Sequence, residues 1–397
     1  MKTLTTKLLI TLLMALPAGH VIAQGFNSGS TGADGALNVT NSTTLNLPPD
    51  GILNYTTINL AVGAILKFNR NAFNTPVYLL AQSNVTISGT IDVSGNPGTS
   101  VPPTGGLGGP GGFDGGMPGF DIVPPGAGYG PGGGRGGSNI GGANGAGSGS
   151  YATVGLNSLS TNRGAVYGSP LLVPLVGGSG GGGSAGAPGV AGGGGSGGGG
   201  AILIASSSRI TVSGSISSRG GEGNNVSPGL FYDRNGSGGA VRLVAPAVSG
   251  AGSIDVQGGY TYATYGGLGR TRIDTIDRTS LQLRFQGLAS VGTFMAVFPS
   301  PLPRLDILQA ADITIPEGSP TPVQVQLPFG SATNRTVTIQ ARDFNASVPI
   351  NVVLTPETGL PQVYPVTIFN AASNPATITV PVNLPVNTLV TISAWTR

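Results

Sequence analysis

Residues 177–221 read GGSGGGGSAGAPGVAGGGGSGGGGAILIASSSRITVSGSISSRGG. The first half is nearly all glycine and serine, so it offers almost no side chains that can pack. The second half alternates apolar and polar residues, which is typical of a β-strand with one buried face. Both kinds of sequence recur along most of the chain. This stretch therefore predicts a repetitive, all-β protein in which glycine-rich segments alternate with strands.

The first 23 residues have the features of a secretory signal. Lys2 and Lys7 form a basic start, Leu8–Leu16 forms a short apolar core, and small residues follow before Gln24. A retained membrane anchor is the alternative, but the apolar run is shorter than the roughly 20 residues that span a bilayer. No later segment approaches that length. We therefore expect a secreted, extracellular or cell-surface protein with no transmembrane segment after cleavage.

The residue types that are absent exclude several kinds of chemistry. The chain has no cysteine, and its one histidine, His20, lies inside the predicted signal. Catalysis by Ser-His-Asp or Cys-His groups, Cys/His zinc sites and disulfide bonds are thereby excluded. We expect no enzyme, no catalytic residue, no metal and no cofactor.

The charge composition also limits the possible partners. Charged residues make up 8% of the chain, against about 25% in ordinary globular proteins. Removal of Lys2 and Lys7 leaves 18 − 2 = 16 basic residues against 15 acidic ones, a net charge of +1. No basic patch of the kind that binds nucleic acid is present, so we expect no nucleic-acid partner.

One strand pattern recurs along the chain. Apolar residues alternate with polar ones, a glycine follows, and a second alternation ends at glycine or a large apolar residue. The four copies are Ile58–Phe68, Val85–Gly95, Ile210–Gly220 and Val248–Gly258. An apolar strand precedes three of them, at Val77–Ala81, Ala201–Ala205 and Ala240–Ala245.

Such repeats are typical of a parallel β-solenoid, or β-helix, whose coils bury their apolar faces by stacking. In this interpretation the glycine forms the bend between faces because it tolerates positive φ, and Ala201–Ala205 lies parallel to Ala240–Ala245. The alternative is a set of local hairpins, although no Asn-Gly or Asp-Gly stands at the turn position. We assign residues 24–298 to the β-solenoid domain.

A long glycine-rich insertion, about residues 96–200, interrupts this domain. Of the 96 residues from Gly105 to Gly200, 41 are glycine. At about 0.5–1 kcal/mol each relative to alanine, they disfavour order by tens of kcal/mol. Order therefore requires a dense lattice of backbone hydrogen bonds, as in packed polyglycine-II helices. We expect packed extended segments near the ends and a mobile middle around Ser138–Arg163.

Glycine becomes rare after Pro299, where Thr, Val, Ile and Pro dominate. SPLPRLDI is predicted to be a linker, and seven short alternating strands follow. They are ADITIP, PVQVQLP, RTVTIQA, VPINVVLTP, QVYPVTIFN, ATITVPVNLP and TLVTISAW. This spacing favours an immunoglobulin-like β-sandwich over residues 299–397.

Two groups of side chains are candidates for a functional site. Asp92 and Asp255 occupy equivalent positions in their repeats, and paired carboxylates are what glycoside hydrolysis needs. The copy between them carries Ser217, so we interpret both as outward surface residues. Tyr260, Tyr262 and Tyr265 stand close together and can stack on sugar rings or contact a partner. The alternative is that these tyrosines cap the end of the solenoid.

The repeats and the glycine-rich sector, over roughly residues 50–290, resemble glycine-rich surface and adhesin-type proteins of bacteria, which have β-helical stalks. The C-terminal residues do not resemble the translocator barrel of autotransporters. The resemblance implies a structural or adhesive protein of the cell surface or extracellular matrix. We expect its partners to be surface or matrix polysaccharides or proteins, and self-association is possible. The alternative function is a carbohydrate-binding or carbohydrate-active β-helix.

Overall fold

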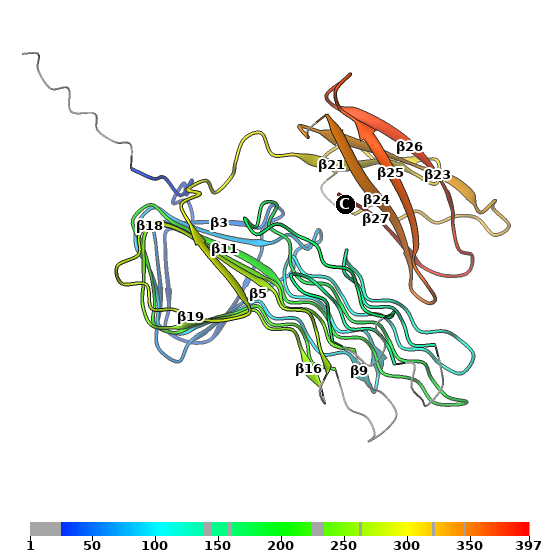
Figure 1. Cartoon of the computed structure of the whole chain (residues 1–397), viewed down its shortest axis with the longest axis horizontal. Coiled ribbons are helices and arrows are strands. Elements are labelled where there is room, and N and C mark those ends of the chain that lie inside the picture. The colour runs from blue at the N-terminus through cyan, green and yellow to red at the C-terminus, as the bar shows by residue number, and fades with distance from the viewer. Residues whose placement is uncertain are drawn as a thin grey trace, which may run out of the picture.

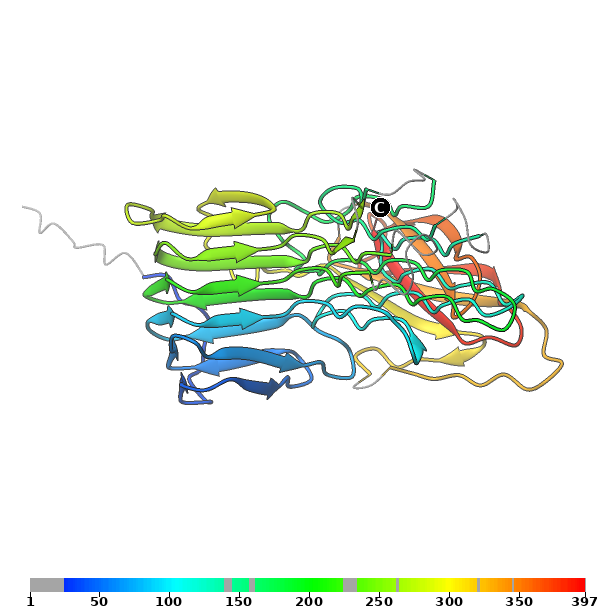
Figure 2. The ribbon, with the colours of Figure 1, turned by 90° about the horizontal axis from the view of Figure 1, so that it is seen from below.

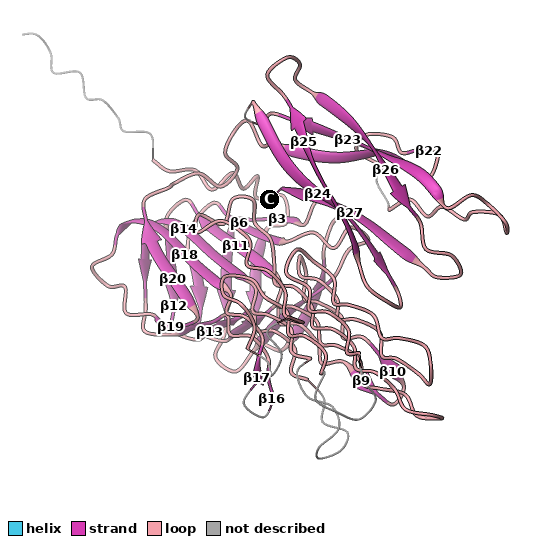
Figure 3. Ribbon diagram, turned by 45° about the vertical axis from the view of Figure 1, so that its right-hand side comes forward, coloured by secondary structure: helices cyan, strands magenta, loops and turns pink. Residues whose placement is uncertain are grey.

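The computed structural model describes residues 25–138, 145–156, 161–223, 234–261, 264–319, 322–344 and 346–396. Within these ranges every regular element is a β-strand (Figure 3), so the predicted all-β class is confirmed. The described residues accordingly include no helix long and apolar enough to cross a membrane. Two bodies of different strand direction are joined through residues 293–303.

The first body consists of parallel strands on three faces, which form a triangle in Figure 1. Face A contains β3 (Ile52–Tyr55), β6 (Val77–Ala81), β11 (Ala201–Ser206), β14 (Ala240–Ser249), β18 (Arg270–Asp277) and β20 (Leu288–Gly292). Face B contains β1 (Ala36–Val39), β4 (Thr57–Leu60), β7 (Val85–Ile87), β12 (Arg209–Val212) and the later residues of β14. Face C contains β2 (Thr43–Asn46), β5 (Ile65–Asn69), β8 (Thr90–Asp92), β13 (Ser215–Ser217), β15 (Ser253–Asp255) and β19 (Arg284–Gln286).

The chain visits the faces in the order A, B, C, and each round, or coil, lies on the previous one (Figure 2). The predicted neighbours confirm this order, because Ala201–Ala205 pairs in parallel with Ala240–Val244 residue for residue. The hairpin alternative is wrong for these repeats, since β4, β7 and β12 pair in parallel with one another.

Inward side chains form columns through the stacked coils. Leu79, Ile204 and Leu243 follow one another in register on face A, and each is fully buried. Because successive residues of a strand point to opposite faces, only alternate residues enter this core. Burial of each such side chain stabilises the fold by about 1.5–3 kcal/mol.

The repeated glycines lie at the corner between faces B and C, as predicted, but the expected positive φ holds for only some of them. Gly63 and Gly250 adopt it, whereas Gly89, Gly214 and Gly252 do not. They stack on one another instead, and a Cβ at Gly214 would lie 2.0 Å from the carbonyl oxygen of Gly89. Glycine is needed at this corner because the stacked backbones approach so closely.

The glycine-rich insertion extends from one corner of the coils as a bundle of extended segments, here called the glycine lattice (residues 93–138, 145–156, 161–200, 218–223, 234–239, 256–261 and 264–269). In the run 177–184, every third amide donates to the antiparallel run 193–199. The pairs are Gly178 to Gly199, Gly181 to Ser196 and Ser184 to Gly193, at 2.8, 2.9 and 2.8 Å. Intervening amides bind other segments, among them Gly177 to Gly111, Gly180 to Tyr129 and Gly182 to Gly147.

Three successive amides that bind three different neighbours are the pattern of three-per-turn helices packed side by side. This confirms backbone hydrogen bonding as the source of order in the described part of the insertion. The same geometry requires glycine, since a Cβ at Gly195 or Gly198 would lie 2.0 Å from a carbonyl oxygen of run 177–184.

The mobile middle predicted for Ser138–Arg163 is wrong where the structure describes it. Gly147 donates to the Arg135 carbonyl at 2.7 Å and Gly149 to that of Asn235 at 2.9 Å, so this part is bonded into the lattice. The prediction of mobility followed from the conformational cost of glycine, which these backbone hydrogen bonds offset. The remainder of that prediction, at residues 139–144 and 157–160, lies outside the described residues.

Two short hairpins and an adjoining apolar cluster complete this part of the structure. Two hairpins lie in it, β9 (Thr99–Ser100) with β10 (Pro103–Thr104), and β16 (Tyr260–Thr261) with β17 (Thr264–Tyr265). Between the lattice and the outer side of face A lies a second apolar cluster that contains Tyr151 and Tyr167. Burial raises the pKa of both phenols above the ordinary value.

The second body has two antiparallel sheets packed on one core (Figure 1). One contains β21 (Arg304–Ala310), β22 (Ile313–Thr314), β23 (Asn334–Arg342) and β26 (Ala376–Asn383). The other contains β24 (Ser347–Pro356), β25 (Gln362–Phe369) and β27 (Val390–Thr396).

The predicted linker SPLPRLDI is partly wrong, because its last residues begin β21. The predicted strand PVQVQLP is also wrong: prolines at both ends lack an N–H donor, and residues 322–328 form no strand.

A buried ion pair binds the segment 293–303 that connects the two bodies. Arg242 is 1% exposed and its guanidinium lies 3.0 Å from the carboxylate of Asp274, which is fully buried. Arg242 also donates to the backbone carbonyls of Phe294 and Ala296, at 3.0 and 2.9 Å. Further along, Trp395 of the second body packs edge-on against Phe113 of the lattice, with ring centroids 6.5 Å apart.

Candidate functional site

The hairpin β16–β17 brings two of the three predicted tyrosines together. Tyr260 pairs with Tyr265 across the hairpin, and their ring centroids lie 4.8 Å apart at 32°. The side chains are 48% and 45% exposed. Tyr262, the third predicted residue, lies outside the described residues. The hairpin does not cap the coils, because β18 and β20 complete face A after it.

These tyrosines form one side of a surface groove of about 470 Å³. The segment 153–156 also lines the groove and pairs with the hairpin, since Leu156 exchanges two backbone hydrogen bonds with Tyr265, at 2.8 and 2.9 Å. Arg219 and Gln257 add planar polar groups to the lining. The full lining is Thr153, Val154, Leu156, Arg219, Gln257, Gly258, Tyr260, Tyr265, Gly266 and Leu268.

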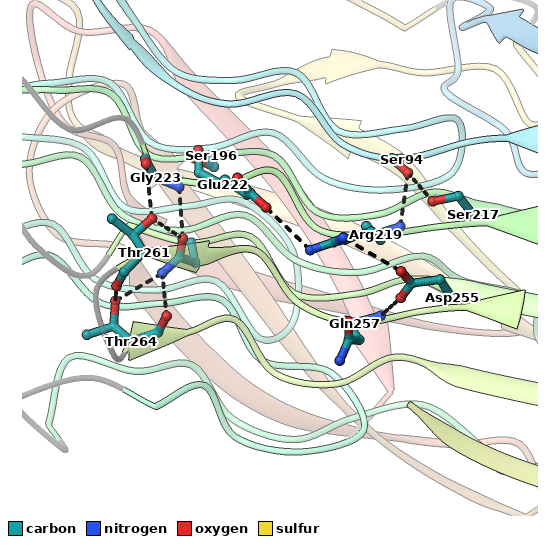
Figure 4. A network of polar contacts seen from close by, with 11 residues as sticks. Ser94, Ser196, Ser217, Arg219, Glu222, Gly223, Asp255, Gln257, Thr261 and Thr264 are labelled. Carbon is teal, nitrogen blue, oxygen red and sulfur yellow. Dashed lines mark hydrogen bonds and ion pairs between the residues drawn. The ribbon is translucent and has the colours of Figure 1, made fainter. Parts of the chain in front are cut away.

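A polar network holds the hairpin in place (Figure 4). The buried Asn235 accepts hydrogen bonds from the N–H of Gly223 at 2.8 Å and from the hydroxyl of Thr261 at 2.9 Å. Its amide nitrogen donates to the carbonyl and hydroxyl oxygens of Thr264, at 3.2 and 3.1 Å. One buried amide thus joins both strands of the hairpin to the lattice, so that the tyrosines stand on a fixed support.

Arg219 is held between two carboxylates at the groove. Its guanidinium lies 3.3 Å from Glu222 and 3.7 Å from Asp255, and its backbone N–H donates to the Ser94 hydroxyl at 3.1 Å (Figure 4). The Arg219 side chain is 37% exposed and that of Glu222 is 59% exposed. The groove therefore presents a cation and an aromatic pair together, and the exposed carboxylate of Glu222 lies beside the cation.

The two repeat aspartates do not meet. Ser217 lies between them in register on face C, which places Asp92 and Asp255 two strands apart, at about 4.8 Å per strand. Lys67 lies 3.2 Å from Asp92, and each carboxylate also accepts the N–H two residues ahead at 3.0 Å. These carboxylates are satisfied by neighbours and stabilise strand ends.

Sequence reasoning found the tyrosines but missed Arg219, Gln257 and Leu156. Arg219 and Gln257 follow β13 and β15 at equivalent positions, so the repeat alignment contained a signal for that pair. Nothing in the sequence near Leu156 connects it to Tyr265, because this contact depends on the lattice.

Comparisons with protein-family models, with curated proteins and with solved structures found no match to this chain.

Proposed function

We propose that this chain is a secreted or cell-surface structural and adhesive protein that attaches to polysaccharide through the tyrosine groove. In this proposal the parallel coils are a β-solenoid that serves as a rigid body. The glycine lattice is a rigid extension that carries the binding groove. The antiparallel body is an immunoglobulin-like β-sandwich that serves as a second attachment module.

The observation that carries the proposal is the exposed Tyr260–Tyr265 pair on a fixed support. Aromatic faces bind the apolar faces of sugar rings, and stacked geometries of aromatic groups contribute about 0.5–1.5 kcal/mol beyond area burial. Arg219 and Gln257 beside them offer several donors at once, which suits the adjacent hydroxyl groups of a sugar. An apolar surface with a few placed polar groups is the usual composition of a binding site.

Adhesion fits these residues better than catalysis does. The carboxylates nearest the groove, Glu222 and Asp255, are both engaged by Arg219. Glycoside hydrolysis needs a pair of carboxylates that flank the scissile bond, whereas both of these carboxylates are held by the same guanidinium. The groove is therefore suited to holding a glycan unchanged.

Binding of the mature chain to a glycan array and to insoluble polysaccharides tests this proposal. Tyr260→Ala and Tyr265→Ala are each expected to weaken binding about tenfold, which corresponds to about 1.4 kcal/mol. Phe329→Ala is the matched control, because Phe329 is fully exposed but belongs to the antiparallel body. Its binding is expected to equal that of the wild type.

Two outcomes contradict the proposal. One is glycan binding that survives both tyrosine substitutions. The other is a mature chain that binds no polysaccharide and is released from the producing cells without any extraction.

A further inference from the structure

Both ends of the parallel body leave inward side chains uncovered. In the first coil, Leu37, Leu45 and Leu53 lie on faces B, C and A in turn and are only partly buried. Their neighbours in the next coil, Ile58, Phe68 and Leu79, are buried. The three leucines are only partly buried because, among the described residues, no further strand stacks beneath them.

The last coil repeats this arrangement. Val291 on face A is 37% exposed, although Ile273 beside it is fully buried. Phe285 on face C and Leu281 at the next corner are likewise partly buried. Each end of the triangular body is thus a shallow apolar surface of about one inward side chain per face.

The first and last strands of the parallel body also lie on consecutive faces. The first strand, β1, lies on face B, and the last, β20, lies on face A. Because the chain visits the faces in the order A, B, C, the strand that would follow β20 belongs on face B. The order of faces therefore continues from β20 of one copy to β1 of the next, although the last round passes face B after Asp277 without forming a strand.

Charge on the two ends has opposite sign. Residues 25–57 carry two charged side chains, Asp34 and Asp50, which gives 0 − 2 = −2. Residues 270–292 carry four arginines and two aspartates, which gives 4 − 2 = +2. End-to-end contact therefore brings complementary charges together, which favours this orientation over contact between like ends.

We propose that the mature chain assembles head to tail, with the first coil of one copy seated on the last coil of a second copy. In this joint Val291 of one copy lies on Leu53 of the next, because both belong to the same face A column. On face A, the N–H groups of Ile52 and Asn54 already donate to the carboxylates of Asp50 and Asp34. These N–H groups cannot pair with another copy, so on this face the two copies contact each other through side chains. On faces B and C, the outermost strands β1 and β2 supply open edges for parallel pairing.

A contact between unlike surfaces of identical copies does not close on itself when it involves translation along one axis, so the product is a filament. This inference goes beyond the proposed function and stands even if the groove binds nothing.

Sedimentation velocity and electron microscopy of the mature chain over a range of concentrations test the inference. The wild type is expected to form linear oligomers that lengthen with concentration. Leu53→Glu and Val291→Arg each place a charge at one end, and each variant alone is expected to remain monomeric. Both positions are partly exposed, so the monomers are expected to keep the wild-type circular dichroism and Trp395 fluorescence.

An equal mixture of the two variants provides the sharpest test. The Leu53→Glu variant still has a wild-type last coil, and the Val291→Arg variant still has a wild-type first coil. These two unchanged ends can form one wild-type joint. Mixing is therefore expected to restore dimers. Longer chains form if the introduced Arg of one variant pairs with the introduced Glu of the other across the second joint. A wild type that stays monomeric at every concentration overturns the inference, as do variants that still assemble alone or a mixture that stays monomeric. Phe329→Arg is the control and is expected to assemble normally.

Discussion

The stacked coils and the glycine lattice are continuous in the chain, yet they are held together by different forces. In the coils, large inward side chains such as Leu243 are fully buried, and the backbone pairs only along the sheets. In the lattice, successive amides bind in three directions, and Gly198 has no space for even one methyl group. Burial and backbone hydrogen bonding can thus each order a long segment. Burial requires large side chains, whereas the close backbone packing of the lattice requires none.

The largest effect is expected from enlarging a lattice residue. In Gly198→Ala, the new Cβ would lie 2.0 Å from the carbonyl oxygen of Gly178, and both backbones are hydrogen-bonded on several sides. We expect a loss of about 4 kcal/mol or more in the free energy of unfolding, which is an exceptional cost for one methyl group. Denaturant unfolding followed by Trp395 fluorescence measures it. Gly25→Ala is the control, since nothing lies within 4 Å of its Cβ position; equal stability of the two variants would contradict a close-packed lattice.

In the coils, the damaging change is a smaller side chain rather than a larger one. Leu243→Ala removes a fully buried side chain from the face A column, and we expect a loss of about 2–5 kcal/mol. Val291→Ala is the matched control, because it occupies the same column at its exposed end and should cost less than about 1 kcal/mol. The same denaturant experiment compares them. If both variants lost equal stability, the column would not be the core of the coils.

Alkaline pH is expected to affect the boundary between coils and lattice. The folded-state pKa values of Tyr151 and Tyr167 lie above the ordinary value of 10.0, chiefly because burial disfavours the phenolate. Stability is therefore unaffected below pH 10 and falls above it, where the unfolded chain ionises first. Arg234, whose pKa burial lowers to about 10, acts in the opposite sense, because above pH 10 the unfolded chain keeps this proton longer than the folded chain does.

Thermal unfolding between pH 8 and pH 12, together with tyrosinate absorbance, checks this expectation. Absorbance that rises in a single step at the ordinary tyrosine pKa, without unfolding, would show that the two phenols are not buried.

The smallest effect is expected at the surface of face C. Lys67 lies 3.2 Å from Asp92, but its side chain is 56% exposed, so solvent screens the pair. Lys67→Ala should change the free energy of unfolding by less than about 1 kcal/mol. A loss above about 2 kcal/mol in the same denaturant assay would mean that surface charge, rather than burial, supports the coils.

The sequence was sufficient to predict the parallel coils, because a strict alternation and a repeated glycine specify which residues face inward. It did not predict the bonding pattern of the lattice, because every glycine looks alike and only the packing of segments distant in the chain distinguishes them. The strand at Arg304–Ala310 was missed because the prolines before it suggested a linker.

For the candidate site, the closeness of Tyr260 and Tyr265 followed from the local pattern. The groove did not, because Leu156, which also lines it, is about a hundred residues away in the chain and only the lattice brings it there.

Amide hydrogen exchange tests most directly the claim that the lattice is ordered by its backbone. The amides of Gly178, Gly181 and Gly198 each donate to a carbonyl of another lattice segment. We predict that they exchange as slowly as the amides of β11 and β14, because both sets open only when the parallel body unfolds. Complete exchange of the glycine amides within seconds, while β11 and β14 stay protected, would contradict the account.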